Sequence, residues 1–141
     1  MDTPIKKPLI LIVDDDPVLR RLFGSLLGNA GYEVQDASDA DQGQELAVRL
    51  QPDLILMDKN LPGIDGIAAS ERLKKDAATA HISIALLTNE DLSVETEKRM
   101  KEVPIADCIQ KRLDNKEFIE RVKKILGTTE HKLAQEEKSV G

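Results

Sequence analysis

Residues 9–17 read LILIVDDDP, five aliphatic residues followed by three aspartates and a proline. An aliphatic run this short, unbroken by polar residues, is typical of a central parallel strand covered on both faces. Asp16 is suited to cap a helix, and Pro17 to occupy the first helical turn. The segment therefore predicts a buried strand that ends in carboxylates and leads directly into a helix.

A polar residue also stands at or just beyond the end of three further apolar runs: Asp58, Thr88 and Lys111. In an open parallel α/β sheet the carboxyl ends of the strands form the edge at which sites are built. We therefore expect these three residues and the aspartates at 14–16 to meet in one pocket. Carboxylates gathered with a hydroxyl and an amine are typical of a site for a divalent metal ion and a phosphoryl group.

Strand-like and helix-like segments alternate along the rest of the chain. The expected strands cover residues 9–13, 32–36, 53–57, 82–87 and 105–109. The expected helices begin at Pro17, at Ser38 or Asp39, at Ile67, at Asp91 or Ser93, and at Asp114, and the last of them ends at Gly127. This alternation predicts a parallel sheet with right-handed crossovers and helices on both faces.

The length of 141 residues suits one domain that buries roughly two-thirds of its unfolded surface. We place this domain at residues 8–127, after an N-terminal extension of residues 1–7. Residues 128–141 are polar and lack periodicity, which predicts a mobile tail. No DNA-binding or enzymatic output domain is expected after residue 126.

Composition and charge argue against several classes of function. The net charge of −6 argues against nonspecific nucleic-acid binding, and two Phe, one Tyr and no Trp leave little for base stacking. A single cysteine, Cys108, precludes an internal disulfide and suits a reducing cytoplasm. The chain has neither a signal-peptide pattern nor a run near the ~20 apolar residues that span a bilayer. These features predict a cytoplasmic protein with no membrane insertion and no direct nucleic-acid contact.

Five motifs match those of one known family in order and spacing: residues 11–17, 53–58 and 61–66, with Thr88 and Lys111. Their joint occurrence is far more specific than any one of them. On these residues the chain resembles the receiver domain of two-component response regulators over about residues 8–126. The resemblance implies a flavodoxin-like, doubly wound parallel sheet of five strands in the order 2-1-3-4-5, with five helices.

The resemblance also implies a role for each residue of the phosphoryl site. Asp58 is the expected phosphoacceptor, and Thr88 and Lys111 are expected to contact the phosphoryl oxygens. Lys111 would set a positive charge against the equatorial oxygens of a loose transition state. The expected donor is a phosphohistidine on a histidine kinase or on a histidine phosphotransfer protein.

A Mg²⁺ site is implied at the same carboxylates, with Mn²⁺ as the alternative ion. Asp15 is expected to bind the ion directly and Asp14 through water. Asp58 and the backbone carbonyl of Asn60 are the further expected ligands. Repulsion among these carboxylates also favours a bound cation, because two unit charges ~4 Å apart repel by about 4 kcal/mol at an effective dielectric of 20. A hard cation removes that repulsion and keeps Asp58 ionised as a nucleophile.

The predicted function is that of a single-domain response regulator. The protein would catalyse its own phosphorylation and dephosphorylation at Asp58, without turnover of an external substrate. Its output would pass to a downstream protein partner through surface contacts, or onward in a phosphorelay.

Two departures from the family pattern bear on signalling. Arg112 follows Lys111 where the family usually has a proline, and Cys108 stands where the family often has an aromatic residue. A cis bond before Arg112 would cost ~2.5–4 kcal/mol, so a trans bond or a rearranged loop is expected. These departures leave open a receiver-like protein-binding module that acts without phosphorylation.

Two other classes of protein remain as alternatives. A small phosphohydrolase is suggested by the spacing of Asp14 and Asp16, although no substrate pocket or cap region is evident. An FMN-binding flavodoxin has less support, because no Ser/Thr/Gly-rich phosphate loop follows the first strand. Taken singly, Asp16 is more simply a helix cap and Lys111 a solvated charge, so the predicted site depends on the joint occurrence of its residues.

Overall fold

The computed structural model describes the backbone of residues 7–140 and the side chains of residues 7–127. Residues 1–6, most of the predicted N-terminal extension, lie outside the described part. The strands are β1 (Leu9–Val13), β2 (Glu33–Ala37), β3 (Leu54–Asp58), β4 (Ser83–Thr88) and β5 (Asp107–Gln110). The helices are α1 (Pro17–Asn29), α2 (Ala40–Leu50), α3 (Gly66–Lys75), α4 (Val94–Glu102) and α5 (Asn115–Val140).

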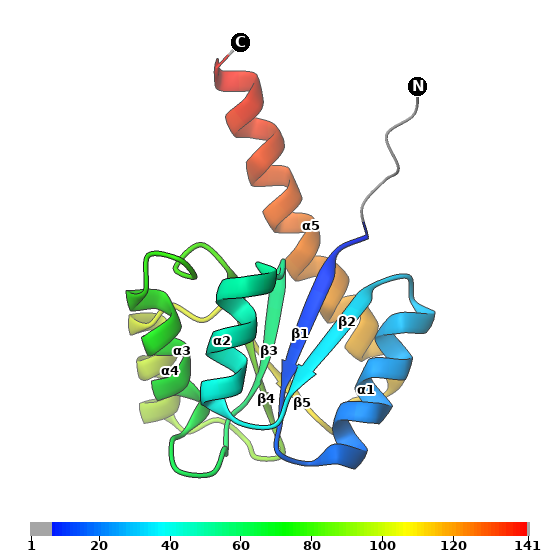
Figure 1. Ribbon diagram of the computed structural model, residues 1–141, viewed down its shortest axis with the longest axis vertical. Helices are drawn as coiled ribbons and strands as arrows, with labels where there is room; N and C mark the ends of the chain where they lie inside the picture. Colours follow the sequence, from blue (N-terminus) through cyan, green and yellow to red (C-terminus); the bar gives the residue numbers. More distant parts are fainter. Residues whose placement is uncertain (1–6, 141) are drawn as a thin grey trace.

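The strands form one parallel sheet in the order β2-β1-β3-β4-β5, which confirms the predicted topology. Helices α1 and α5 cover one face of this sheet, and α2, α3 and α4 cover the other (Figure 1). The helix after β1 and the helix before β3 lie on opposite faces of the sheet, although β1 and β3 are neighbouring strands. In doubly wound sheets this is the point at which the carboxyl ends of the strands leave a crevice for a site.

Alternation along the strands supplies a hydrophobic core on each face of the sheet. In β1, Ile10 and Ile12 pack toward α1 and α5, whereas Leu11 and Val13 pack toward α2 and α3. Every residue of β3 is buried, as expected for a central strand covered on both sides. A shift of one residue in strand register would turn every buried side chain to the opposite face of the sheet. The two cores therefore fix the register, and with it the positions of the strand ends.

Side-chain caps define where the helices begin and settle two open alternatives. The Asp16 carboxylate accepts a hydrogen bond from the Val18 N–H at 2.9 Å, as predicted for α1. Asp39, not Ser38, caps α2, and Ser93, not Asp91, caps α4. Each cap satisfies an N–H group that the first helical turn leaves without a partner.

The last helix is longer than the sequence predicted. The predicted end at Gly127 is wrong, because α5 continues to Val140 through most of the segment predicted as a mobile tail. A glycine costs about 1 kcal/mol inside a helix, but it ends the helix only when it adopts a left-handed conformation. In the described part of the chain, the glycines with positive φ are Gly31 and Gly63. Figure 1 shows the end of α5 projecting beyond the sheet.

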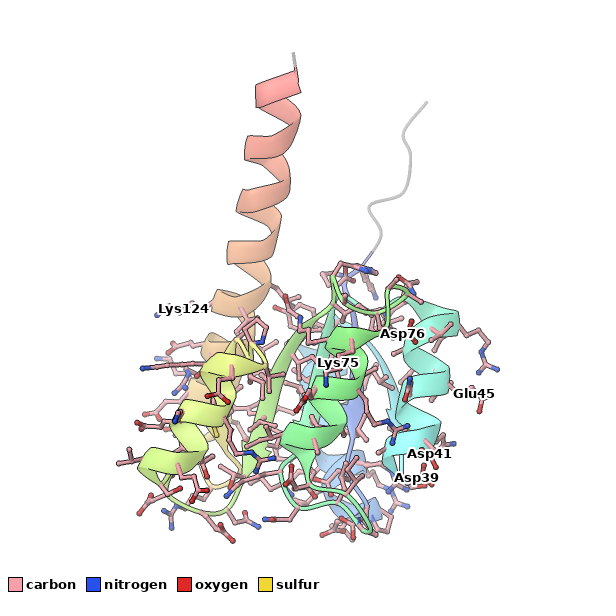
Figure 2. The ribbon with its side chains drawn as sticks, turned by 90° about the vertical axis from the view of Figure 1, so that its left-hand side faces the viewer. Asp39, Asp41, Glu45, Lys75, Asp76 and Lys124 are labelled. Atoms are coloured by element: carbon pink, nitrogen blue, oxygen red, sulfur yellow. The ribbon has the colours of Figure 1, made fainter. Side chains whose placement is uncertain are left out.

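The outer faces of the helices are polar. Asp41 and Glu45 of α2 and Lys75 of α3 point away from the sheet (Figure 2). This arrangement is typical of helices that bury one apolar stripe against a core. Among residues 7–140, no helix is both long enough and apolar enough to cross a membrane.

Candidate functional site

The carboxyl ends of four strands carry the predicted site residues to one edge of the sheet. Asp14 follows β1, Asp58 ends β3, Thr88 ends β4, and Lys111 follows β5. Lys111 Nζ lies 2.9 Å from Asp14 Oδ2 and 3.2 Å from Asp58 Oδ1. All three side chains of this ion-paired group are at most 8% exposed. An ammonium group is thus held between two buried carboxylates.

A third carboxylate completes an acid cluster, which consists of Asp14, Asp15 and Asp58. One oxygen of each lies within 4.8 Å of the others. Asp14 and Asp58 are buried, whereas Asp15 is exposed and forms the solvent side of the cluster. The buried Asp14 Oδ2 lies 2.9 Å from the Lys111 ammonium. Carboxylate oxygens clustered in this way are suited to a hard cation with oxygen ligands.

Backbone groups fix the two buried carboxylates in place. The Asp16 N–H donates to Asp14 Oδ1 at 2.9 Å, and the Asn60 N–H donates to Asp58 Oδ1 at 3.1 Å. Asn60 is itself held by an antiparallel bridge to Asp65. Because Asp58 uses Oδ1 for both Asn60 and Lys111, its Oδ2 lies outside these contacts.

Burial and neighbouring charges have opposite effects on the pKa values of Asp58 and Lys111. Burial raises the pKa of Asp58, as does the nearby charge of Asp14, and together these outweigh the Asn60 N–H and Lys111, which lower it. Burial alone would lower the pKa of Lys111, but its contacts with Asp14 and Asp58 outweigh burial and raise it. The surroundings of Lys111 therefore favour its charged form, whereas those of Asp58 disfavour its ionised form relative to an exposed carboxylate.

Thr88 is buried at the end of β4, and its contacts run toward the loop that follows. Its Oγ1 accepts a hydrogen bond from the Glu90 N–H at 3.1 Å. Its carbonyl accepts one from the Lys111 N–H at 2.8 Å, which ties the Lys111 backbone to β4. Thr88 thus connects the candidate site with the β4–α4 loop.

Gly66 is a residue whose role at this site was missed. The sequence analysis included it only within the motif at residues 61–66, yet a Cβ at this position would collide with the backbone oxygen of Asp58. The Gly66 N–H also donates to Lys59 O at 2.7 Å, which closes the loop against the end of β3. A glycine eight residues after the aspartate, at the start of α3, was the available signal.

The family model for the response regulator receiver domain matches residues 10–123. This chain belongs to that family. The match contains the whole acid cluster together with Thr88 and Lys111. Receiver domains are the signalling domains of two-component systems, so the family membership predicted from the motifs is confirmed.

Two similar transcriptional regulators are longer than this receiver domain. RpaA of Synechocystis sp., described as a DNA-binding dual master transcriptional regulator, is 40% identical over 123 residues, which are 87% of this chain and 51% of RpaA. The phosphate regulon regulator PhoB of Pseudomonas aeruginosa is 38% identical, over 85% of this chain and 52% of PhoB. The chain thus spans about half the length of these relatives. Protein PilH of P. aeruginosa is 33% identical, over 83% of this chain and 96% of PilH.

Solved receiver domains share the fold. A CheY-like receiver domain protein from Methanospirillum hungatei superposes with a TM-score of 0.83 at 25% identity, covering 90% of this chain and 99% of that one. The BeF3-activated N-terminal receiver domain of RstA from Klebsiella pneumoniae gives a TM-score of 0.75 at 29% identity, covering 84% and 97%. These similarities confirm the predicted flavodoxin-like fold.

The two departures from the family pattern have distinct surroundings in this receiver domain. The one cis peptide bond among the described residues is Val103–Pro104, so the Lys111–Arg112 bond is trans, as predicted. Arg112 Nη2 lies 3.3 Å from the Asp91 carboxylate on the β4–α4 loop. Cys108 is partly buried, and burial raises the pKa of its thiol, with the Asp107 charge adding to the increase.

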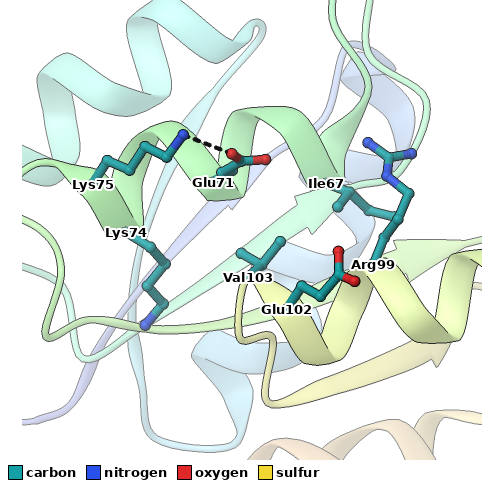
Figure 3. Close-up of a pocket in the computed structure, with 7 residues that line it drawn as sticks. All are labelled: Ile67, Glu71, Lys74, Lys75, Arg99, Glu102 and Val103. Carbon is teal, nitrogen blue, oxygen red and sulfur yellow. Dashed lines mark ion pairs between the residues drawn. The ribbon is translucent and has the colours of Figure 1, made fainter.

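A separate groove lies between α3 and α4, away from the acid cluster. It has a volume of about 220 Å³, and Ile67 and Val103 contribute its apolar part. The groove also contains the ion pair of Lys75 with Glu71, at 2.8 Å (Figure 3). None of its lining residues belongs to the acid cluster, so it is no part of the candidate site.

Proposed function

We propose that Asp58 accepts a phosphoryl group from the phosphohistidine of a histidine kinase or of a histidine phosphotransfer protein. The observation that carries this proposal is the buried Asp58 carboxylate, 3.2 Å from the Lys111 ammonium and within 4.8 Å of two further carboxylates. Membership of the receiver domain family supports it, because these side chains lie inside the matched residues 10–123.

In the proposed step, an oxygen of Asp58 forms a bond to phosphorus as the bond between phosphorus and the donor nitrogen breaks. The electron pair of that bond leaves with the histidine, and Asp58 becomes an acyl phosphate. Lys111 is placed to contact the phosphoryl oxygens, because its ammonium already lies beside Asp58. Thr88 would contribute its hydroxyl from the neighbouring strand end.

The residues present fit a Mg²⁺ or Mn²⁺ ion. Asp15, Asp58 and the backbone carbonyl of Asn60 would hold it, with Asp14 bound through water, because one oxygen of each aspartate lies within 4.8 Å of the others. When bound, the ion would supply positive charge against the clustered carboxylates and the phosphoryl oxygens. Asp15, the exposed member, lies on the side from which an ion and a donor would enter.

In this proposal the protein is a cytoplasmic signalling component, as its single cysteine suggests. It would catalyse its own phosphorylation and slow hydrolysis at Asp58, with no turnover of an external substrate. The phosphorylated form would signal through contacts with a downstream protein, or pass the phosphoryl group on in a phosphorelay. The kinase or phosphotransfer protein and the downstream protein are thus the two kinds of partner.

Intact-mass spectrometry after incubation with acetyl phosphate, with and without Mg²⁺, tests the proposal. We expect one labile phosphoryl adduct that requires both Mg²⁺ and Asp58, and that is absent from Asp58→Asn. Asp53→Asn is the matched control, because Asp53 lies just before β3, at the opposite edge, where it accepts the Leu9 N–H at 2.7 Å. Loss of the adduct in both variants would indicate misfolding.

The absence of any adduct on the wild-type chain would call for a second measurement with beryllofluoride, which mimics a bound phosphoryl group. Failure of both would contradict the proposal and favour a binding module that acts without phosphorylation. Arg112 and Cys108 are the residues that motivate this alternative. Turnover of a generic phosphate ester would instead favour a phosphohydrolase.

A further inference from the structure

Lys59 is a restrained lysine that lies next to Asp58 but outside the acid cluster. Its side chain is only 17% exposed, although lysines usually extend into water. Its backbone N–H donates to Leu87 O at 2.8 Å, which continues the β3–β4 pairing one residue past Asp58. Its ammonium lies 3.3 Å from the Glu90 carboxylate. Both ends of the residue are therefore tied to β4 and to the loop after it.

Glu90 makes two contacts that join this lysine to Thr88. Its side chain forms the ion pair with Lys59, and its backbone N–H donates to Thr88 Oγ1 at 3.1 Å. The Glu90 side chain is 61% exposed, so the ion pair is modest in strength and sensitive to salt. A single loop residue thus links the Lys59 ammonium to the hydroxyl at the end of β4.

The hydrogen bond to Thr88 restricts where its hydroxyl proton points. A hydroxyl group has one donor and two acceptor positions, and accepting the Glu90 N–H occupies one of the acceptor positions. If the Glu90 backbone rotates, the direction of the Thr88 O–H bond changes with it. The restraint on Glu90 is therefore also a restraint on the hydroxyl.

We infer that Lys59 is a positioning residue that acts through Glu90 to hold the Thr88 hydroxyl in the orientation from which it contacts a phosphoryl group on Asp58. The inference rests on the proposed function, and it adds a residue that acts on the site without touching the reacting atoms. No covalent step is added, because Lys59 neither donates nor accepts a group.

The other end of the same loop is held less firmly. Arg112 and Gln110, from the end of β5, contact Asp91 at 3.3 Å and 3.0 Å. The Arg112 and Asp91 side chains are 65% and 86% exposed, so their contact is more strongly screened than that of Lys59. Lys59 is therefore the principal side-chain restraint on Glu90 among the described ion pairs.

A double-mutant cycle on binding of beryllofluoride in the presence of Mg²⁺ tests the inference, with backbone amide NMR as the readout. We expect Lys59→Met, which keeps the apolar stem, to weaken binding roughly two- to fivefold, the range for loss of one partly exposed ion pair. Lys59→Arg should restore the wild-type affinity. In a Thr88→Val background, Lys59→Met should cause no further loss, because its effect passes through the hydroxyl.

Lys75→Met is the matched control, since it removes the same charge from an ion pair on α3 with Glu71. We expect it to leave the affinity for beryllofluoride unchanged. An equal loss from Lys59→Met with and without the Thr88 hydroxyl would show a general charge effect and overturn the inference. So would an equal loss from Lys75→Met.

Hydrogen exchange of the Glu90 amide provides a readout that needs no ligand. We expect the amide to exchange several times faster in Lys59→Met than in the wild type, and at the wild-type rate in Lys75→Met. Unchanged exchange in Lys59→Met would overturn the inference. If the wild-type chain binds no beryllofluoride and forms no adduct, the proposed function fails, and the exchange rates still decide whether Lys59 restrains Glu90.

Discussion

Replacing Asp58 by asparagine is expected to stabilise the protein when no divalent cation is present. Asparagine keeps the side-chain shape and the oxygen that accepts the Asn60 N–H, and it removes one of three clustered charges. Burial and the Asp14 charge raise the pKa of Asp58 above its ordinary value, so the folded chain binds this proton more tightly than the unfolded chain does. An ionised Asp58 therefore costs free energy of folding near neutral pH.

The magnitude follows from opposing charges at known distances. The Asp14 and Asp58 oxygens lie within 4.8 Å, which corresponds to a repulsion of about 3.5 kcal/mol at an effective dielectric of ~20. The Lys111 ammonium, 3.2 Å from Asp58, contributes an attraction of about 5 kcal/mol on the same scale. These largely cancel, so the several kcal/mol for desolvating a carboxylate determines the sign. We expect Asp58→Asn to raise the free energy of unfolding by about 1–2 kcal/mol, or Tm by roughly 3–6 °C.

Urea and thermal unfolding in EDTA at about pH 7 measure this difference, with Asp53→Asn as the control at the other edge of the sheet. The advantage of the variant should grow as pH rises through the raised pKa of Asp58. It should vanish well below 3.8, the ordinary pKa, because Asp58 is then protonated in the folded and in the unfolded chain. Added Mg²⁺ should stabilise the wild type more than Asp58→Asn, because the ion binds the ionised cluster. A wild-type chain that is the more stable of the two in EDTA would refute this reasoning.

Three further expectations concern the backbone, the core and the cysteine. Gly66→Ala should lower the free energy of unfolding in urea by about 2 kcal/mol or more, because the added Cβ meets the Asp58 backbone oxygen. Gly28→Ala is the control: it has open space in α1 and should raise the free energy of unfolding by ~0.5–1 kcal/mol. Equal effects of the two substitutions would contradict this prediction. Phe118→Ala should lower it by about 3–5 kcal/mol, since the ring is 2% exposed; a loss under ~1 kcal/mol would show that α5 packs elsewhere. Alkylation of Cys108 should rise with an inflection above pH 9.0, because burial raises the pKa of its thiol, and a lower inflection would count against burial.

The central strands could be predicted from local patterns because both faces of each are buried. Residues 9–13 match β1, and the runs expected at 53–57 and 82–87 begin and end one residue before β3 and β4. The last strand was placed too early, at 105–109 in place of Asp107–Gln110. Ile105 lies between a turn and β5; its N–H donates to Met100 O, while its side chain packs against the core. An apolar residue in such a connection has the same local pattern as one in a strand.

Helix boundaries were harder to predict, because several residues of similar chemistry stand near each end. Ser38 and Asp39 can both cap a helix, and backbone geometry selects Asp39. Gly127 is a residue type that often ends helices, but its φ is not positive, and α5 continues to Val140. The residue type limits which backbone conformations are possible, and the surrounding structure determines which of them is adopted.

The alternation of strands and helices along the chain, and the residues at the strand ends, follow from the sequence alone, because hydrophobic periodicity and turn chemistry act over a few neighbouring residues. The carboxyl ends of parallel strands share one edge, so the sequence also predicted that Asp14, Asp58, Thr88 and Lys111 meet there. The spatial order of the strands came from the family resemblance, and the folded chain confirms it. The pairing of Lys59 with Glu90 required the folded chain, since these residues are 31 positions apart and meet only when β3 and β4 are in register. Side-chain partners, burial and pKa shifts depend on such distant neighbours, which packing brings together and no local pattern specifies.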